Sequence, residues 1–110
     1  EPIECWDTSN VISMYQMFKY TSKFNQPIDS WDVSQVETME DMFKDARSFN
    51  KPIGSWNVSQ VENMKGMFRS ASSFNQSIDS WNVSQVDNMK EMFSVQILST
   101  NQLTHGMSLR

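Results

Sequence analysis

Apolar and polar residues follow one pattern along most of the chain, and this pattern repeats every 25 residues. Three successive copies read FNQPIDSWDVSQVETMEDMFKDARS, FNKPIGSWNVSQVENMKGMFRSASS and FNQSIDSWNVSQVDNMKEMFSVQIL. Twelve of the 25 positions are identical in all three copies, and eight of these twelve are apolar. A fixed period of this length is typical of repeat proteins, in which each unit buries its apolar side against its neighbours. The pattern therefore indicates an architecture before it indicates a function.

Within one unit the spacing of the apolar residues changes, and this change predicts two elements. Trp31 and Val33, with Ile28 ahead of them, fit a short β-strand that buries one face. The apolar residues that follow recur at the spacing of one face of a helix of about three turns. They are Val36, Met39, Met42, Phe43 and Ala46. Ser34 and Glu37 stand three residues apart at the junction, which is the spacing of a helix capping box.

These two elements predict an α/β solenoid. Strands stacked at this period would lie side by side about 4.8 Å apart, as a parallel β-sheet on one face with the helices on the other. The segment IDSWDVSQV also fits the LxxLxLxxN spacing of leucine-rich repeats, although Val36 stands where Asn is usual. We therefore expect a leucine-rich-repeat-like right-handed coil of strand–helix units.

The repeats predict one domain of four units followed by a tail. The units span residues 1–23 (partial), 24–48, 49–73 and 74–98. In residues 99–110 the pattern decays, and this tail is either a degenerate cap over the last layer or a frayed terminus. Glu1-Pro2-Ile3 aligns with Gln26-Pro27-Ile28, so we expect the chain to be a processed or excised piece of a longer protein.

The repeat resembles that of a known family of surface proteins. FN, then W-D/N-V-S, then M-x-x-M-F at fixed spacing is similar to the Trp/Met-rich repeat of about 25 residues in BspA-like leucine-rich-repeat proteins and mycoplasma-type lipoproteins. The resemblance covers about residues 3–98. It implies a secreted or surface-attached protein with a non-enzymatic role in adhesion, and it carries over no catalytic residue.

Composition and charge narrow the classes of partner. The net charge is −4 and no Lys/Arg cluster is present, which argues against nucleic acid and anionic membrane surfaces as partners. No apolar run approaches the roughly 20 residues of a membrane span, so direct membrane insertion is not expected. The single Cys5 occupies the position of Ser30 in the next unit and excludes a disulfide framework.

The residues that suggest chemistry have structural explanations. The methionines of the M-x-x-M positions could bind a soft metal or form an adaptable groove, but their spacing favours a core stripe. The tryptophans at the repeat period could form a carbohydrate platform, but they share the buried face of the predicted strand. His105 has no second His and no nucleophile at a motif spacing. We therefore expect no enzyme activity, no cofactor and no metal.

Two groups of polar residues remain as candidate sites. The face opposite the tryptophans aligns small hydroxyl, carboxylate and amide groups from successive units and is the predicted ligand face. Its candidate residues are Ser30, Asp32, Ser55, Asn57, Ser80 and Asn82. Asn57 and Asn82 also open N-x-S sequences, as does Asn75, and would be glycosylation acceptors in a secreted eukaryotic protein. Asn25, Asn50 and Asn75 are predicted to form an asparagine ladder along the stack.

Two functions fit these features. One is a binding module, extracellular or at the cell surface, that engages a protein or glycan. The other is a structural stalk or filament segment in which repeats stack end to end, with self-association through the ends. Ile3 and Trp6 lie in a first layer that no earlier unit covers in this chain, so we expect an open apolar end there.

Overall fold

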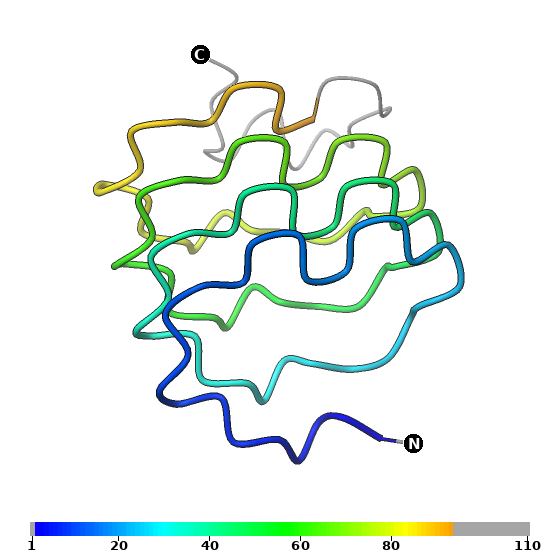
Figure 1. Cartoon of the computed structure of the whole chain (residues 1–110), viewed down its shortest axis with the longest axis horizontal. Helices are drawn as coiled ribbons and strands as arrows, with labels where there is room; N and C mark the ends of the chain where they lie inside the picture. The colour runs from blue at the N-terminus through cyan, green and yellow to red at the C-terminus, as the bar shows by residue number, and fades with distance from the viewer. Residues whose placement is uncertain (1, 94–110) are drawn as a thin grey trace.

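The backbone of each unit is a succession of tight turns. The computed structural model describes residues 2–93, in which the chain passes through four layers, blue to yellow, each following the course of the one before (Figure 1). Within a layer, a backbone N–H repeatedly donates to the carbonyl three residues earlier. In the second unit these donor–acceptor pairs are Trp31 to Ile28, Val36 to Val33, Met42 to Met39, Lys44 to Asp41, Ala46 to Phe43 and Phe49 to Ala46. Each such bond closes a β-turn.

The predicted α/β solenoid of leucine-rich-repeat type is therefore wrong. Residues 2–93 contain no helix, and their β-pairing is limited to isolated parallel bridges that join Ser13 to Thr38, Thr38 to Asn63 and Asn63 to Asn88. Neither the expected parallel sheet nor the expected layer of helices forms. The predicted division into units stays a prediction, and its tail, residues 99–110, lies outside the described residues.

Left-handed residues explain why the segment with the helical spacing is not a helix. Asp41 has φ 57° and Asp45 has φ 59°, whereas every residue of a right-handed helix has negative φ. The same two positions have positive φ in the other units, at Gln16, Gly66 and Glu91 and at Tyr20 and Ser70. Each is the third residue of a β-turn, where a type II turn requires positive φ. A left-handed residue twice in each unit interrupts any helix.

The turn also explains why the apolar spacing was misleading. Met39 and Met42 are the first and fourth residues of one turn, with the Met42 N–H donating to the Met39 carbonyl over 3.1 Å. A β-turn brings these two residues within about 7 Å, so both side chains can face the same core. A spacing of three is therefore shared by a helix stripe and by a chain of turns.

Amides that the turns leave free donate to the next unit. Met39, Asp41, Phe43 and Asp45 alternate along the chain, and each donates to a carbonyl 24 residues later over 2.8–2.9 Å. Their acceptors are Asn63, Lys65, Met67 and Arg69. Because buried backbone groups need partners, this register satisfies in the neighbouring unit what a helix would satisfy four residues away.

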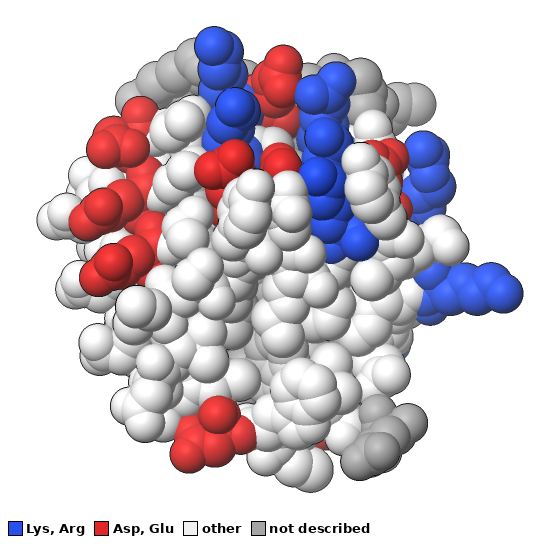
Figure 2. Space-filling view, viewed as in Figure 1, with Lys and Arg blue, Asp and Glu red and all other residues white. Residues whose placement is uncertain are grey.

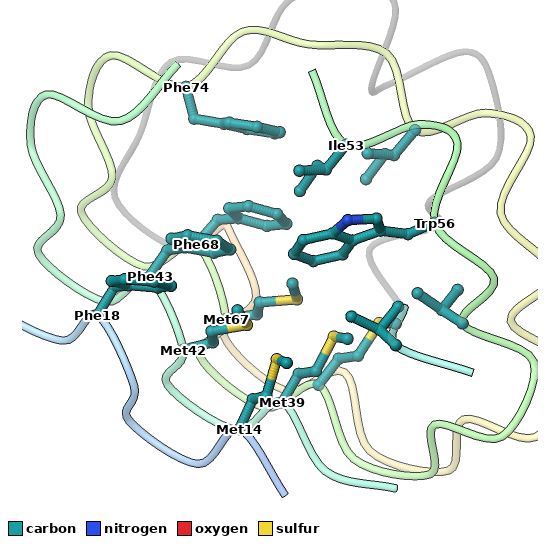
Figure 3. Close-up of a cluster of buried hydrophobic side chains, with 14 of the residues drawn as sticks. Met14, Phe18, Met39, Met42, Phe43, Ile53, Trp56, Met67, Phe68 and Phe74 are labelled. Atoms are coloured by element: carbon teal, nitrogen blue, oxygen red, sulfur yellow. The ribbon is translucent and has the colours of Figure 1, made fainter. Parts of the chain in front are cut away.

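The identical apolar positions form one continuous core. Phe18, Phe43 and Phe68 lie in a row with near-parallel rings, their centroids 5.5 and 5.6 Å apart (Figure 3). The methionine side chains line up beside them in the same way, and Met39, Met42, Met64 and Met67 are fully buried. The predictions that the methionines and the later tryptophans belong to the core are confirmed, since Trp31, Trp56 and Trp81 are also buried.

Each buried tryptophan also joins its unit to the one before. The Trp56 indole Nε1–H donates to the Ile28 carbonyl over 3.0 Å. Trp31 and Trp81 make the same bond, to Ile3 and Ile53, over 2.9 and 3.0 Å. The indole therefore contributes both ring packing and a polar contact between neighbouring layers.

Gly66→Ala distinguishes a chain of turns from a helix by the sign of its effect. Gly66 has φ 64°, and an added Cβ would collide with the Asp41 carboxylate oxygen. We expect the substitution to lower the free energy of unfolding by about 1–2 kcal/mol, measured by denaturant titration. In a helix it would instead raise stability by roughly 0.5–1 kcal/mol. Ser70→Gly, at a position with φ 59°, is the control and should leave stability unchanged or raise it.

Trp56→Phe should be destabilising by more than about 1 kcal/mol, because it removes a buried hydrogen bond and part of a buried ring. Trp6→Phe is the matched control, since Trp6 is 52% exposed and no residue of the described range accepts a bond from its indole. We expect a change of less than roughly 0.5 kcal/mol for the control. Equal thermal shifts for the two variants would contradict the assigned role of the indole.

Candidate functional site

The predicted ligand face lies on the outside of the stack. Its six residues are all exposed: Ser30, Asp32, Ser55, Asn57, Ser80 and Asn82. Their neighbours Trp31 and Trp56 are buried, so exposed and buried positions alternate here as expected, although the backbone forms turns and not a strand. Whether a ligand binds this face, and whether Asn57 and Asn82 are glycosylated, stay predictions.

The carboxylates and amides of this face hold local turns. Asp32 Oδ1 accepts from the Ser34 backbone N–H at 2.9 Å and from its hydroxyl at 2.6 Å. Asp7 accepts the same two bonds from Ser9 at 3.0 and 2.6 Å. In the later units, Asn57 and Asn82 accept from the backbone N–H of Ser59 and Ser84. These are Asx-turns. The predicted helix cap at Ser34 is wrong, because that serine donates to Asp32 and no helix follows.

The same contacts change the titration of the two acids. The hydroxyl of Ser34, followed by its backbone N–H, lowers the pKa of Asp32 below its model value of 3.8, because both bonds favour the charged carboxylate. Ser9 lowers the pKa of Asp7 for the same reason. Asn57 and Asn82 hold equivalent turns without any titration, so the charge is not needed for the turn itself.

The serines of this face connect successive units. The Ser30 hydroxyl donates to the Glu4 carbonyl at 3.0 Å, and the Ser80 hydroxyl donates to the Gly54 carbonyl at 2.8 Å. In each case the acceptor lies 26 residues earlier in the sequence. The polar groups that looked like ligands therefore have partners inside the stack, and this accounts for their regular spacing.

The predicted asparagine ladder is confirmed. Asn25 Oδ1 accepts from the Asn50 backbone N–H at 2.9 Å, and Asn50 Oδ1 accepts from the Asn75 backbone N–H at 2.8 Å. Gln76 adds a bond from its side-chain amide to Asn50 Oδ1 at 3.1 Å. Each asparagine thus satisfies a backbone donor of the following unit, which is a structural role.

The first unit carries an exposed apolar surface that the sequence reasoning largely missed. Ile12 is 61% exposed, Tyr15 is 53% exposed and Tyr20 is 64% exposed. We call these three residues the first-unit patch. The same positions in later units are polar or charged: Glu37, Glu62 and Asp87; Glu40, Lys65 and Lys90; Asp45 and Ser70. That contrast between aligned units was the available signal. Lys19 Nζ lies 5.0 Å from the centre of the Tyr20 ring.

Trp6 and Met17 are exposed for a different reason. Their positions face the core in the later units, but here they are 52% and 38% exposed because no described layer covers them. We call Trp6 and Met17, with the backbone beside them, the end face. The predicted open apolar end at Trp6 is confirmed, and Ile3 beside it is partly buried.

Charged side chains gather in rows along the stack. Figure 2 shows acidic groups along one edge, basic groups in another region and uncharged side chains between them. Lys19 lies 3.9 Å from Asp41, and Arg69 lies 2.8 Å from Glu91 in the following unit. Such partly exposed pairs contribute little to stability individually. They help to fix which positions of neighbouring units face each other.

Within residues 2–93 no group of three or more His, Cys, Asp or Glu side chains is arranged to hold a metal ion. Cys5 is exposed, and its thiol is not part of a disulfide. A search of the described range for a helix that could cross a bilayer found none. What the geometry offers is an exposed apolar patch and an uncovered end.

Asp32→Asn should make the protein less sensitive to acid while preserving the fold. A lowered folded-state pKa means that the Asp32 turn stabilises the protein above pH 3.8 and that this contribution is lost as the pH falls through the folded-state value. Thermal melts from about pH 5 to about pH 2 should therefore show a smaller decline in Tm for the variant than for the wild type. Identical declines would contradict the role of the carboxylate.

Comparisons with known proteins identify a family but no activity. A family model described as "Mycoplasma protein of unknown function, DUF285" matches residues 1–105. Neither the curated proteins nor the solved structures gave a match. The 25-residue repeat thus finds its counterpart in a family whose description assigns no function. Because the match covers nearly the whole sequence, the chain belongs to this DUF285 family of Mycoplasma-type proteins.

Proposed function

We propose that the protein is a non-enzymatic repeat module of a secreted or surface-attached protein, and that it mediates adhesion by binding a protein or glycan. The observation that carries this proposal is the first-unit patch, where three exposed apolar or aromatic side chains replace the charged and polar residues of later units. The sequence resemblance to BspA-like surface proteins supports the extracellular or cell-surface location. That resemblance concerns the repeat pattern and not a strand–helix fold.

The division of labour within a unit supports a scaffold. The positions that face the core are nearly the same in every unit, because each must pack on the next. The outward positions next to the turns differ, as Tyr15, Glu40 and Lys65 illustrate. Outward residues can therefore change without disturbing the stack, which is the property that lets repeat proteins present a binding surface.

The chemistry of the patch suits a macromolecular partner. Tyr15 and Tyr20 expose rings whose hydroxyls can also form hydrogen bonds, and Ile12 adds aliphatic surface. Tyrosine is enriched at protein interfaces because it contributes a large contact area while losing little conformational entropy. The predicted ligand face is the second candidate surface, but its polar groups already bond within the stack, which makes them weaker recognition groups.

Replacing Tyr15 by Lys and Tyr20 by Ser tests the patch. These residues occupy the same positions in the third unit, as Lys65 and Ser70, and Ser70 has the same positive φ as Tyr20. The double variant should therefore fold normally. We expect its binding to cultured animal cells to fall at least about tenfold, a loss of roughly 1.4 kcal/mol, with an unchanged Tm.

The matched control makes the same changes one unit later, Glu40→Lys with Asp45→Ser, and should bind as the wild type does. Pretreating the cells with protease or with glycosidases then separates a protein partner from a glycan partner. Full binding by the tyrosine variant, or equal losses in both double variants, would contradict the proposal that the first-unit patch is the binding surface.

A further inference from the structure

We propose that copies of this chain associate head to tail, with the end face of the first unit docking on the last described unit of a second copy. This interface goes beyond ligand binding by the first-unit patch, because it uses a different surface and a partner of identical sequence. The proposal rests on the polarity of the backbone edges at the two ends of the stack and on the register that every internal interface shares.

The first unit ends in a row of unpaired hydrogen-bond acceptors. At the interface between the first and second units, the carbonyls of the second unit accept from the first: Thr38 from Met14, Glu40 from Gln16, Met42 from Phe18 and Lys44 from Tyr20. The equivalent carbonyls of the first unit are those of Ser13, Tyr15, Met17 and Lys19. Within residues 2–93 no donor reaches any of these four. An edge of this kind is a template for pairing.

The fourth unit presents the complementary edge. In the third unit the N–H groups of Met64, Gly66 and Phe68 donate to the fourth. The equivalent donors in the fourth unit are Met89, Glu91 and Phe93. No carbonyl of the described range accepts from these three. One end of the stack therefore offers acceptors and the other offers donors, with the same spacing.

Side chains at the two ends match in the same register. Met92 and Phe93 would lie over Met17 and Phe18, continuing the rows in which Phe68 and Phe93 stack at 5.4 Å. Trp6 would pack on the partner's copy of Trp81, as Trp56 packs on Trp81 at 6.5 Å within one chain. The Trp6 indole would then donate to the partner's copy of the Ile78 carbonyl, because every buried tryptophan bonds to the isoleucine 28 residues before its equivalent position in the stack. The docked face repeats an interface already present three times.

Edge polarity excludes the symmetric alternative. Two end faces placed against each other would oppose carbonyl to carbonyl and leave both rows of acceptors without donors, which is costly once water is excluded. Head-to-tail contact is heterologous, so it does not close on itself in a straight stack and should give a series of oligomers and not a single dimer.

Cys5 provides a direct test, because its position aligns with Ser30, Ser55 and Ser80. Neighbouring layers of a parallel stack lie about 4.8 Å apart, within the 4.4–6.8 Å between Cα atoms that a disulfide spans. In a head-to-tail assembly, Ser80→Cys of one copy would lie beside Cys5 of the next. Mild oxidation of the full-length variant should yield a ladder of disulfide-linked oligomers on a non-reducing gel.

Two controls define the register. Ser55→Cys lies two layers from Cys5 and away from both ends, so it should give no ladder. Ser30→Cys lies in the layer next to Cys5 and should form a disulfide within one chain. A ladder from Ser55→Cys equal to that from Ser80→Cys would overturn the proposal, as would a chain with Cys5 alone that is trapped fully as a Cys5–Cys5 dimer, the head-to-head product.

Solution measurements on the unmodified chain complete the test. We expect the mass from light scattering to rise with concentration, and acrylamide quenching to fall as Trp6, the exposed tryptophan of the four, becomes covered. Met17→Lys places a charge in the end face and should abolish both changes, whereas Ile12→Lys, outside that face, should not. A monomer with an unquenched share of Trp6 emission that is constant at all concentrations, together with no ladder, would refute head-to-tail association.

Discussion

The backbone hydrogen bonds between successive 25-residue units are the interaction on which the rest of the structure depends. Turn bonds satisfy some amides of each unit, but alternate amides such as those of Asp41 and Phe43 find their acceptors only in the next unit. Since unpaired buried amides are costly, no single unit is stable alone. The 24-residue register then places like side chains over one another, which produces the rows of Phe, Met and Trp and their shared core. Packing and hydrogen bonding thus enforce the same register.

This constraint also determines what can carry function. Small polar side chains at the repeat period, including Ser30, Asp32 and Asn50, are occupied by bonds within or between units. Recognition is left to outward positions, whose residues change from unit to unit, and to the ends, where the register has no partner. The first-unit patch and the end face are therefore separate surfaces with separate origins: one comes from substitution at outward positions, the other from an interface that lacks its neighbour.

Much of the packing followed from the sequence, but the local backbone did not. Repeat period and residue type were enough to predict the buried methionines and tryptophans, the asparagine ladder and the open end at Trp6, because these depend on stacking alone. The helix was wrong because Met39 and Met42 are spaced alike in a helix and in a β-turn, and positive φ at Asp41 and Asp45 has no obligatory residue signature. Only Gly66 marks that position with a glycine. The exposed Ile12, Tyr15 and Tyr20 escaped notice because attention fell on what the units share and not on where the first unit differs.

Hydrogen-bond scalar couplings measured by NMR test the central claim most directly. In a uniformly ¹⁵N,¹³C-labelled sample, a long-range HNCO experiment correlates an amide nitrogen with the carbonyl carbon that accepts its hydrogen bond. The turn-and-stack architecture predicts a correlation from the Phe43 amide to the Met67 carbonyl, whose N···O distance is 2.9 Å, and from the Asp41 amide to the Lys65 carbonyl, at 2.8 Å. A correlation from Phe43 to the Met39 carbonyl, four residues earlier, would show the helix that the sequence first suggested and would contradict the account.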